Sequence, residues 1–181
     1  MEIREKSSRK LILFTFIVFL VWVILQFITP LLVPEKRIDD LTGHVGMIDN
    51  EQIIDGVPFP ANLVYRCGDA LCHQKADRSF FINGNQMPFC QRCTAIWLGL
   101  AIGLGFLLIY KINLDEKFIY VILIGVVPIA IDGIGQLVGF WESTAIVRVI
   151  TGLLVGFVSG MAIGIIVDEL RSIRQNRKEM N

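Results

Sequence analysis

Four long apolar runs constrain this chain more than any other feature of its sequence. They cover Leu11–Val33, Thr94–Tyr110, Phe118–Phe140 and Ala145–Val167. Each is close to the roughly 20 residues that a helix needs to cross the hydrocarbon core of a bilayer. None alternates polar and apolar residues as a barrel strand does, and helix is the other way to satisfy the backbone in lipid. We therefore predict an all-α polytopic membrane protein with about four transmembrane helices, in line with a mean hydropathy of +0.60.

The distribution of charge divides the chain into four parts. Residues 1–33 hold a basic N-terminus and the first span, 34–93 a cysteine-rich segment, 94–168 the other three spans and 169–181 a basic tail. Because Lys and Arg favour the cytoplasmic side, we expect a multi-pass protein of the cell membrane with both termini cytoplasmic. The cysteine-rich segment is then extracytoplasmic. The first run is too long for a cleaved signal peptide and is predicted to remain as an anchor.

Glycines recur every four residues on the fourth predicted helix, at Gly152, Gly156, Gly160 and Gly164. Small residues at this spacing let two helix backbones approach closely in lipid. Packing within one bundle is the simpler interpretation, and a seam between two copies of the chain is the alternative.

The four cysteines all lie between positions 67 and 93, in two short-spaced pairs. Cys67 and Cys72 form the first pair, with His73 beside it, and Cys90 and Cys93 form the second. Two such pairs commonly supply the tetrahedral ligands of zinc, so these five residues are the candidate metal ligands and zinc the candidate cofactor. Two disulfides are an alternative on an oxidising side of the membrane. A reversible thiol–disulfide centre is another, since a helix N-terminus would stabilise a thiolate in the second pair.

Polar residues interrupt the third and fourth runs. Asp132 and Gln136 are four residues apart and share a helix face, and Glu142 and Arg148 follow after a short turn. Ionisable groups in a membrane helix normally face protein or a water-filled cavity. We expect Asp132 to pair with Arg148, and these four residues are the catalytic candidates.

The predicted topology places several of these groups around one outward-facing cleft. The candidate substrate-binding residues are Arg78, Ser79, Arg92 and Arg148. Arginine there suits an anionic head group such as a lipid-linked phosphate. The expected partners are the lipid bilayer, an anionic lipid or lipid-linked substrate, and either a second copy of the chain or a membrane complex. Nucleic acid is not expected, because the net charge is zero and no basic stripe is interleaved with aromatic residues.

Several short motifs together resemble a known family. They are Cys72-His73-Gln74, Arg78-Ser79-Phe80, Cys90-x-Arg92-Cys93-Thr94, Asp132-Gly133-x-x-Gln136, Glu142-Ser143-Thr144 and Arg148-x-x-Thr151-Gly152. In this combination the chain resembles the domain-of-unknown-function-2085 family of predicted membrane proteins. The resemblance implies a membrane location and a shared set of motifs, and no particular reaction.

Three functions are compatible with these features. The first is a metal-binding membrane protein whose cleft binds or processes an anionic lipid-linked substrate. The second is a membrane thiol–disulfide redox protein. The third is a non-enzymatic accessory subunit whose cysteine segment, cross-linked by disulfides or zinc, is a docking surface. A zinc ion held by all four cysteines would have no open ligand position, which argues against hydrolysis. Whether the protein is an enzyme is therefore left open at this point.

Overall fold

The helices of this protein follow its apolar runs. The computed structural model describes residues 2–112 and 116–179. Its elements are α1 (Glu2–Ile28), η1 (Thr29–Leu32), α2 (Glu51–Ile54), α3 (Ala61–Leu71), η2 (Ala76–Arg78), β1 (Ser79–Ile82), β2 (Asn85–Cys90), α4 (Gln91–Ile109), α5 (Glu116–Leu137) and α6 (Ala145–Glu179). Four stretches of this described part are long and apolar enough to cross a membrane, namely Arg9–Leu32, Gln91–Ile109, Glu116–Leu137 and Ala145–Arg171. The predicted helical fold with four spans is confirmed, and α6 also continues through most of the basic tail.

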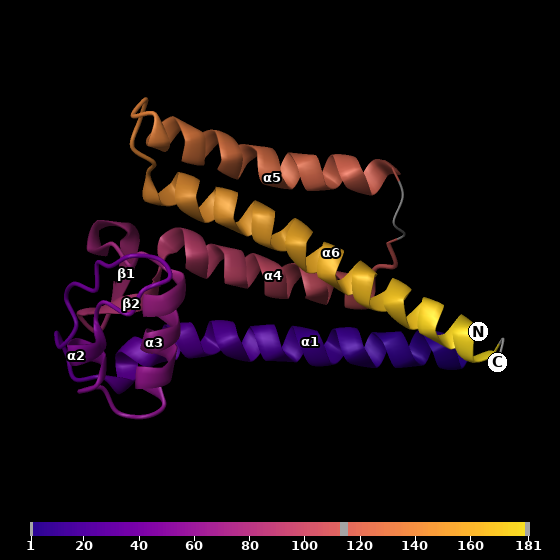
Figure 1. The fold of residues 1–181 in the computed structure, drawn as a ribbon, viewed down its shortest axis with the longest axis horizontal. Coiled ribbons are helices and arrows are strands. Elements are labelled where there is room, and N and C mark those ends of the chain that lie inside the picture. Colours follow the sequence, from indigo (N-terminus) through magenta and orange to yellow (C-terminus); the bar gives the residue numbers. More distant parts are fainter. Residues whose placement is uncertain (1, 113–115, 180–181) are drawn as a thin grey trace.

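The bundle is built around α4 and α6, with α1 against α4 and α5 against α6 (Figure 1). The start of α1 and the end of α6 lie at one end of the bundle, and the cysteine-rich segment lies at the other. At this second end α1 and α5 finish, while α4 and α6 begin. Residues that are far apart in the sequence therefore converge beside the cysteines.

Glycines set the close approach of α4 and α6. A Cβ added at Gly156 would collide with the backbone carbonyl of Ile96, and one added at Gly103 with that of Phe157. Gly160 faces the backbone of α4 in the same way. These glycines let the two helix backbones touch. The glycine stripe therefore serves packing within the bundle.

Between the first two spans the chain folds into a small subdomain around a β-hairpin. β1 pairs with β2 in antiparallel fashion, with Ile82 opposite Asn85, so Asn83 and Gly84 form a two-residue turn. Their φ angles are 55° and 69°, and positive φ at both positions is what a type I′ hairpin turn requires. This hairpin was not among the elements predicted from the sequence, although Asn-Gly between strand-forming residues is its strongest signal.

Buried side-chain amides hold the irregular backbone of the subdomain. The Oδ1 atom of Asn85 accepts hydrogen bonds from the N–H groups of Arg37 and Ile38 at 2.8 and 2.9 Å. The Oε1 atom of Gln86 accepts one from the N–H of Leu41 at 3.0 Å. The apolar core of the subdomain consists of Val33, Ile38, Leu41, Ile54, Val57, Ala61 and Tyr65. Because buried backbone groups need partners, these amides allow a segment with little regular structure to place its cysteines firmly.

Candidate functional site

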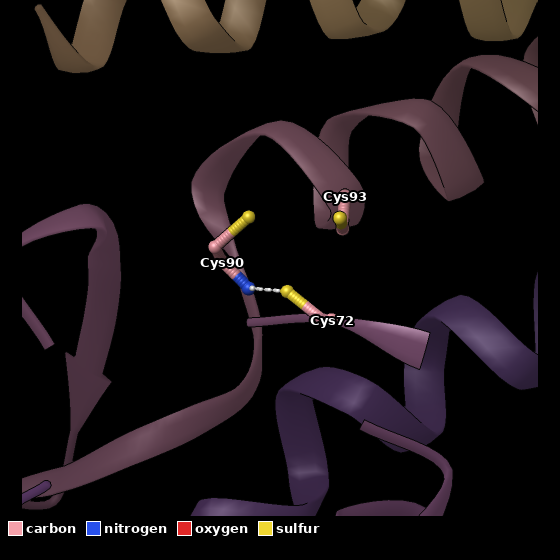
Figure 2. A group of neighbouring side chains, drawn as sticks. All are labelled: Cys72, Cys90 and Cys93. Carbon is pink, nitrogen blue, oxygen red and sulfur yellow. Dashed lines mark hydrogen bonds between the residues drawn. The ribbon is translucent and has the colours of Figure 1, made fainter. Parts of the chain in front are cut away.

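Three of the four cysteine sulfurs gather where the subdomain meets the bundle. The Sγ atoms of Cys72, Cys90 and Cys93 lie within 4.8 Å of one another, and Figure 2 shows them around a common space. Cys72 follows the last residue of α3, Cys90 ends β2, and Cys93 lies in the first turn of α4. All are free thiols, and the first two are buried while Cys93 is partly buried. We call this group the thiol triangle.

Close packing of α3 on β2 brings Cys72 to this place. Gly68, one turn earlier, leaves room for the backbone carbonyl of Pro88, which a Cβ would strike. The Nε2 group of Gln74 donates to the same carbonyl at 2.7 Å. The backbone N–H of Cys90 in turn donates to the Sγ of Cys72 at 3.4 Å. These contacts fix the first cysteine against the strand that carries the second.

Aromatic side chains shield the thiol triangle on the side of the bundle. Trp22 of α1 and Trp97 of α4 meet Phe89 edge-to-face, with ring centroids 5.9 and 6.3 Å away. All three rings belong to the apolar cluster that packs around the cysteines. Such a shell limits the access of water to a metal site and thereby tunes it.

The thiols of the triangle share their protons unequally. The S–H groups of Cys72 and Cys93 donate hydrogen bonds to the sulfur of Cys90, which lowers the pKa of the Cys90 thiol well below its usual range. The hydrogen bond to Cys90 raises the pKa of Cys72. The Cys90 sulfur is therefore the one of the three that most readily gives up its proton, and metal binding would release thiol protons from the others.

The donor set fits tetrahedral zinc. With Zn–S bonds of about 2.3 Å, two sulfurs of a tetrahedral site lie about 3.8 Å apart. Sulfurs within 4.8 Å of one another therefore need to move together by about 1 Å or less to reach that geometry. Three sulfurs leave the fourth position open.

The other two predicted ligands lie beside the thiol triangle and outside it. Cys67 is partly buried on α3 and packs against the apolar cluster, but its sulfur is not within the 4.8 Å group. His73 is partly buried next to Cys72, and its Nδ1 accepts a hydrogen bond from the N–H of Lys75 at 3.5 Å. Burial lowers the pKa of His73. The structure brings together three of the five predicted ligands.

Asp132 pairs with Arg92 of α4, and the predicted pairing with Arg148 was wrong. Asp132 is 4% exposed, and its carboxylate forms an ion pair with the Arg92 guanidinium. It also accepts hydrogen bonds from Gln136 Nε2 at 3.0 Å and from Trp141 Nε1 at 3.3 Å. The prediction assumed that the two arms of the α5–α6 hairpin would supply both partners. The first turn of α4 supplies the arginine instead.

Arg148 is directed toward α4. Its Nη1 donates to the Oε1 of Gln91 at 3.4 Å. Arg78, at the end of η2, donates from Nη1 to the Oε1 of Gln136 at 3.3 Å. Gln136 also contacts Asp132, the partner of Arg92, and Gln91 directly precedes Arg92 in α4, so the three arginines lie close together. These three arginines form one group, the arginine cluster, which three different elements supply.

Two further candidate residues have other surroundings. The hydroxyl of Ser79 donates to the carbonyl of Lys75 at 2.8 Å and accepts from Gln86 Nε2 at 3.0 Å, so it is engaged inside the subdomain. Glu142 is exposed and forms no hydrogen bond or ion pair with the side chains that the structure describes. Of the four catalytic candidates, Asp132 and Gln136 are in contact, while Arg148 lies in the neighbouring arginine cluster.

Sequence reasoning did not single out three residues that shape the site. Gln91 links α4 to Arg148. The sequence feature that could have pointed to Gln91 is its position within the Cys-x-x-Cys motif. Trp141 binds Asp132, and Gly135 leaves the space that its ring fills. Gln26 is fully buried in α1, and its amide has no hydrogen-bond partner in the described part of the chain. The sequence feature that could have pointed to Gln26 is that it is an isolated amide side chain within an apolar span.

The fold and this site define a polytopic α-helical membrane protein with a thiol triangle and an arginine cluster at one end of its bundle. The chain belongs to the family described as predicted membrane protein DUF2085, whose model matches residues 72–163, just over half of the chain. The matched range holds the whole thiol triangle and the whole arginine cluster, whereas Cys67 precedes it. The family resemblance of the motifs is confirmed.

Two archaeal proteins share this region. An uncharacterized protein of Methanocaldococcus jannaschii is 38% identical over 104 residues, which are 55% of this chain and 65% of that protein. The chain thus spans less than two thirds of that relative. An uncharacterized protein of Methanothermobacter thermautotrophicus is 34% identical over 93 residues, which are 51% of this chain and 82% of that protein. No solved structure matches the chain.

Proposed function

We propose that this protein binds a thiophilic divalent metal, zinc foremost, through Cys72, Cys90 and Cys93. The observation that carries this proposal is the mutual proximity of the three sulfurs. Catalytic zinc sites use three protein ligands and keep the fourth position for water or substrate. The argument against hydrolysis, which assumed four cysteine ligands, does not apply to a site with three.

We further propose that the bound metal faces an anionic lipid or lipid-linked substrate held by the arginine cluster. Arginine forks match the geometry of anionic oxygens, and the cluster lies at the ends of membrane-spanning helices. A lipid-linked molecule could place its head group there while its chains stay in the bilayer. With both termini in the cytoplasm of a cell-membrane protein, this site would face outward.

Metal content and free thiols of anaerobically purified protein in detergent test the metal proposal. About one equivalent of zinc per chain is expected, with protected thiols that become reactive after chelation. Replacing the zinc with Co²⁺ should give the intense absorption bands of tetrahedral thiolate coordination.

Cysteine variants supply the matched control. Cys72→Ser, Cys90→Ser and Cys93→Ser should each lose metal, because each removes a ligand. Cys67→Ser should keep one equivalent, since its sulfur lies outside the triangle although it comes from the same subdomain. Loss of metal in Cys67→Ser as well would mean a four-cysteine site.

The same measurement separates the alternatives. Protein without metal, whose thiols react only after reduction, would refute the metal proposal. That result would favour the thiol–disulfide or stapled docking functions.

A further inference from the structure

Arg148 is buried without the compensation that a buried guanidinium requires. The residue is 7% exposed, its Nε has no hydrogen-bond partner in the described chain, and its bond to Gln91 is long at 3.4 Å. Among the described residues no carboxylate forms an ion pair with it. A buried charge without a partner is costly, most of all in a membrane helix. An anionic ligand at this place would remove that cost.

The two neighbouring arginines also have donors to spare. The Nε atoms of Arg78 and Arg92 are buried and lack hydrogen-bond partners within the described chain. Arg92 is paired with Asp132. The Nε of Arg78 lies 3.6 Å from a carboxylate oxygen of Asp77, which is ion-pair distance but beyond hydrogen-bonding distance, and the Asp77 side chain is 71% exposed. Within the described part of the chain, Asp132 is therefore the one buried carboxylate that forms an ion pair with any of these three arginines.

Three donors from three directions favour a tetrahedral oxyanion over a carboxylate. Arg78, Arg92 and Arg148 come from η2, α4 and α6. A planar carboxylate presents its two oxygens to one guanidinium fork, whereas a phosphate presents oxygens in several directions. The arrangement therefore suits a phosphate group.

The place of the cluster in the membrane points to a lipid. Arg92 and Arg148 lie in the first turns of their membrane-spanning stretches, where head groups reside. Basic pockets between transmembrane helices bind phosphate-bearing head groups. We infer that the arginine cluster binds a terminal phosphate group, and that this phosphate is the head group of a membrane lipid. The inference rests on the proposed anionic substrate and specifies its chemistry.

Lipid retention measured by native mass spectrometry tests this inference. Full-length protein in neutral detergent would be offered phosphatidic acid, which has a terminal phosphate, or phosphatidylcholine at equal amounts. The wild-type chain should retain phosphatidic acid selectively. Arg148→Gln should weaken that retention by about tenfold or more, as expected for the loss of one charge-assisted contact.

Arg66→Gln is the matched control. Arg66 lies on α3, is 40% exposed and pairs with Asp55, so its removal should leave lipid retention unchanged. Arg148→Lys provides a second test in case the glutamine variant misfolds. Lysine keeps the positive charge and loses only the planar guanidinium group, which can donate two parallel hydrogen bonds. It should retain phosphatidic acid more weakly than wild type and more strongly than Arg148→Gln.

Zinc content of the same samples separates this inference from the proposed metal site. Cys90→Ser should lose zinc and still prefer phosphatidic acid. A wild-type protein that lacks zinc but loses phosphatidic acid on Arg148→Gln would refute the metal proposal and support the phosphate site.

Three results would overturn the inference in whole or in part. Equal retention of phosphatidic acid by wild type and a folded Arg148→Gln would remove the site. Preference for dodecanoate over phosphatidic acid would exclude phosphate as the ligand. Arg148-dependent binding of inorganic phosphate without retention of phosphatidic acid would support the phosphate site and overturn the lipid source.

Discussion

Replacing Asp132 with asparagine tests whether a buried ion pair holds the end of α5 against α4. Asparagine keeps the size of the side chain, removes its charge and leaves Arg92 without a partner. Breaking a fully buried pair costs about 3–5 kcal/mol. The Arg92 side chain is 23% exposed, so solvent reduces the ion-pair loss to about 2–3 kcal/mol. Mismatched hydrogen bonds to Gln136 and Trp141 add about 1 kcal/mol. We expect the free energy of unfolding to fall by about 3–4 kcal/mol in total.

Reversible unfolding in mixed micelles, followed by tryptophan fluorescence, measures this loss. Glu142→Gln is the matched control, because it removes an acid from the adjacent loop that is exposed and without described partners. Its effect should stay within about 0.5 kcal/mol. Equal losses in the two acid variants would refute the reasoning.

A double-mutant cycle identifies the partner. Asp132→Asn combined with Arg92→Gln should show a coupling energy above about 1 kcal/mol, because each single change leaves the other group unpaired. Combined with Arg148→Gln, the coupling should be below about 0.5 kcal/mol. Stronger coupling to Arg148 would restore the pairing that the sequence suggested.

Two further substitutions probe the packing of the bundle and the hairpin. Gly156→Ala forces a Cβ against the backbone of α4 and should cost about 1–3 kcal/mol of unfolding free energy. Gly133→Ala, where a Cβ meets nothing within 4 Å, should be neutral or slightly stabilising in the same unfolding assay. Gly84→Val places a β-branched residue at a φ of 69° and should cost at least about 1 kcal/mol, measured as faster limited proteolysis of the subdomain. Asn83→Asp, which tolerates the same turn, should leave the proteolysis rate nearly unchanged.

The membrane spans could be predicted from the sequence because the bilayer imposes one requirement on every residue of a span. The predicted first run and the observed span Arg9–Leu32 differ by one or two residues at each end. The third run was predicted to reach Phe140, but α5 ends at Leu137. Gly139 takes a φ of 80° just beyond that end, as glycines that terminate helices commonly do. Hydropathy alone does not register such a stop.

The contacts inside the site depend on directions that spacing does not encode. Cys67 and Cys72 form a plausible ligand pair by spacing. Cys67 lies within α3, however, and Cys72 follows its last residue, in extended conformation. Five residues of helix turn the chain by about 500°, which leaves two such side chains about 140° apart. The helix therefore separates Cys67 from the sulfur that joins the triangle. The partner of Asp132 was not predicted because it also depends on how the helices pack. Glycines bring α4 close to α6, and this packing places Arg92 rather than Arg148 against Asp132.

The first turn of α4 explains how one short motif serves three neighbours. Successive side chains on a helix point about 100° apart. Cys93 therefore faces the subdomain, Gln91 reaches Arg148 of α6, and Arg92 reaches Asp132 of α5. A rotation of α4 by one residue would present glutamine to Asp132 and remove a sulfur from the triangle. The glycines between α4 and α6 fix how α4 is rotated and how closely it packs against α6. They therefore help to position the site residues, although the glycines themselves lie farther along the bundle. Damage to this seam should therefore reduce metal retention as well as stability, whereas a change confined to the lipid-facing side of α5 should not.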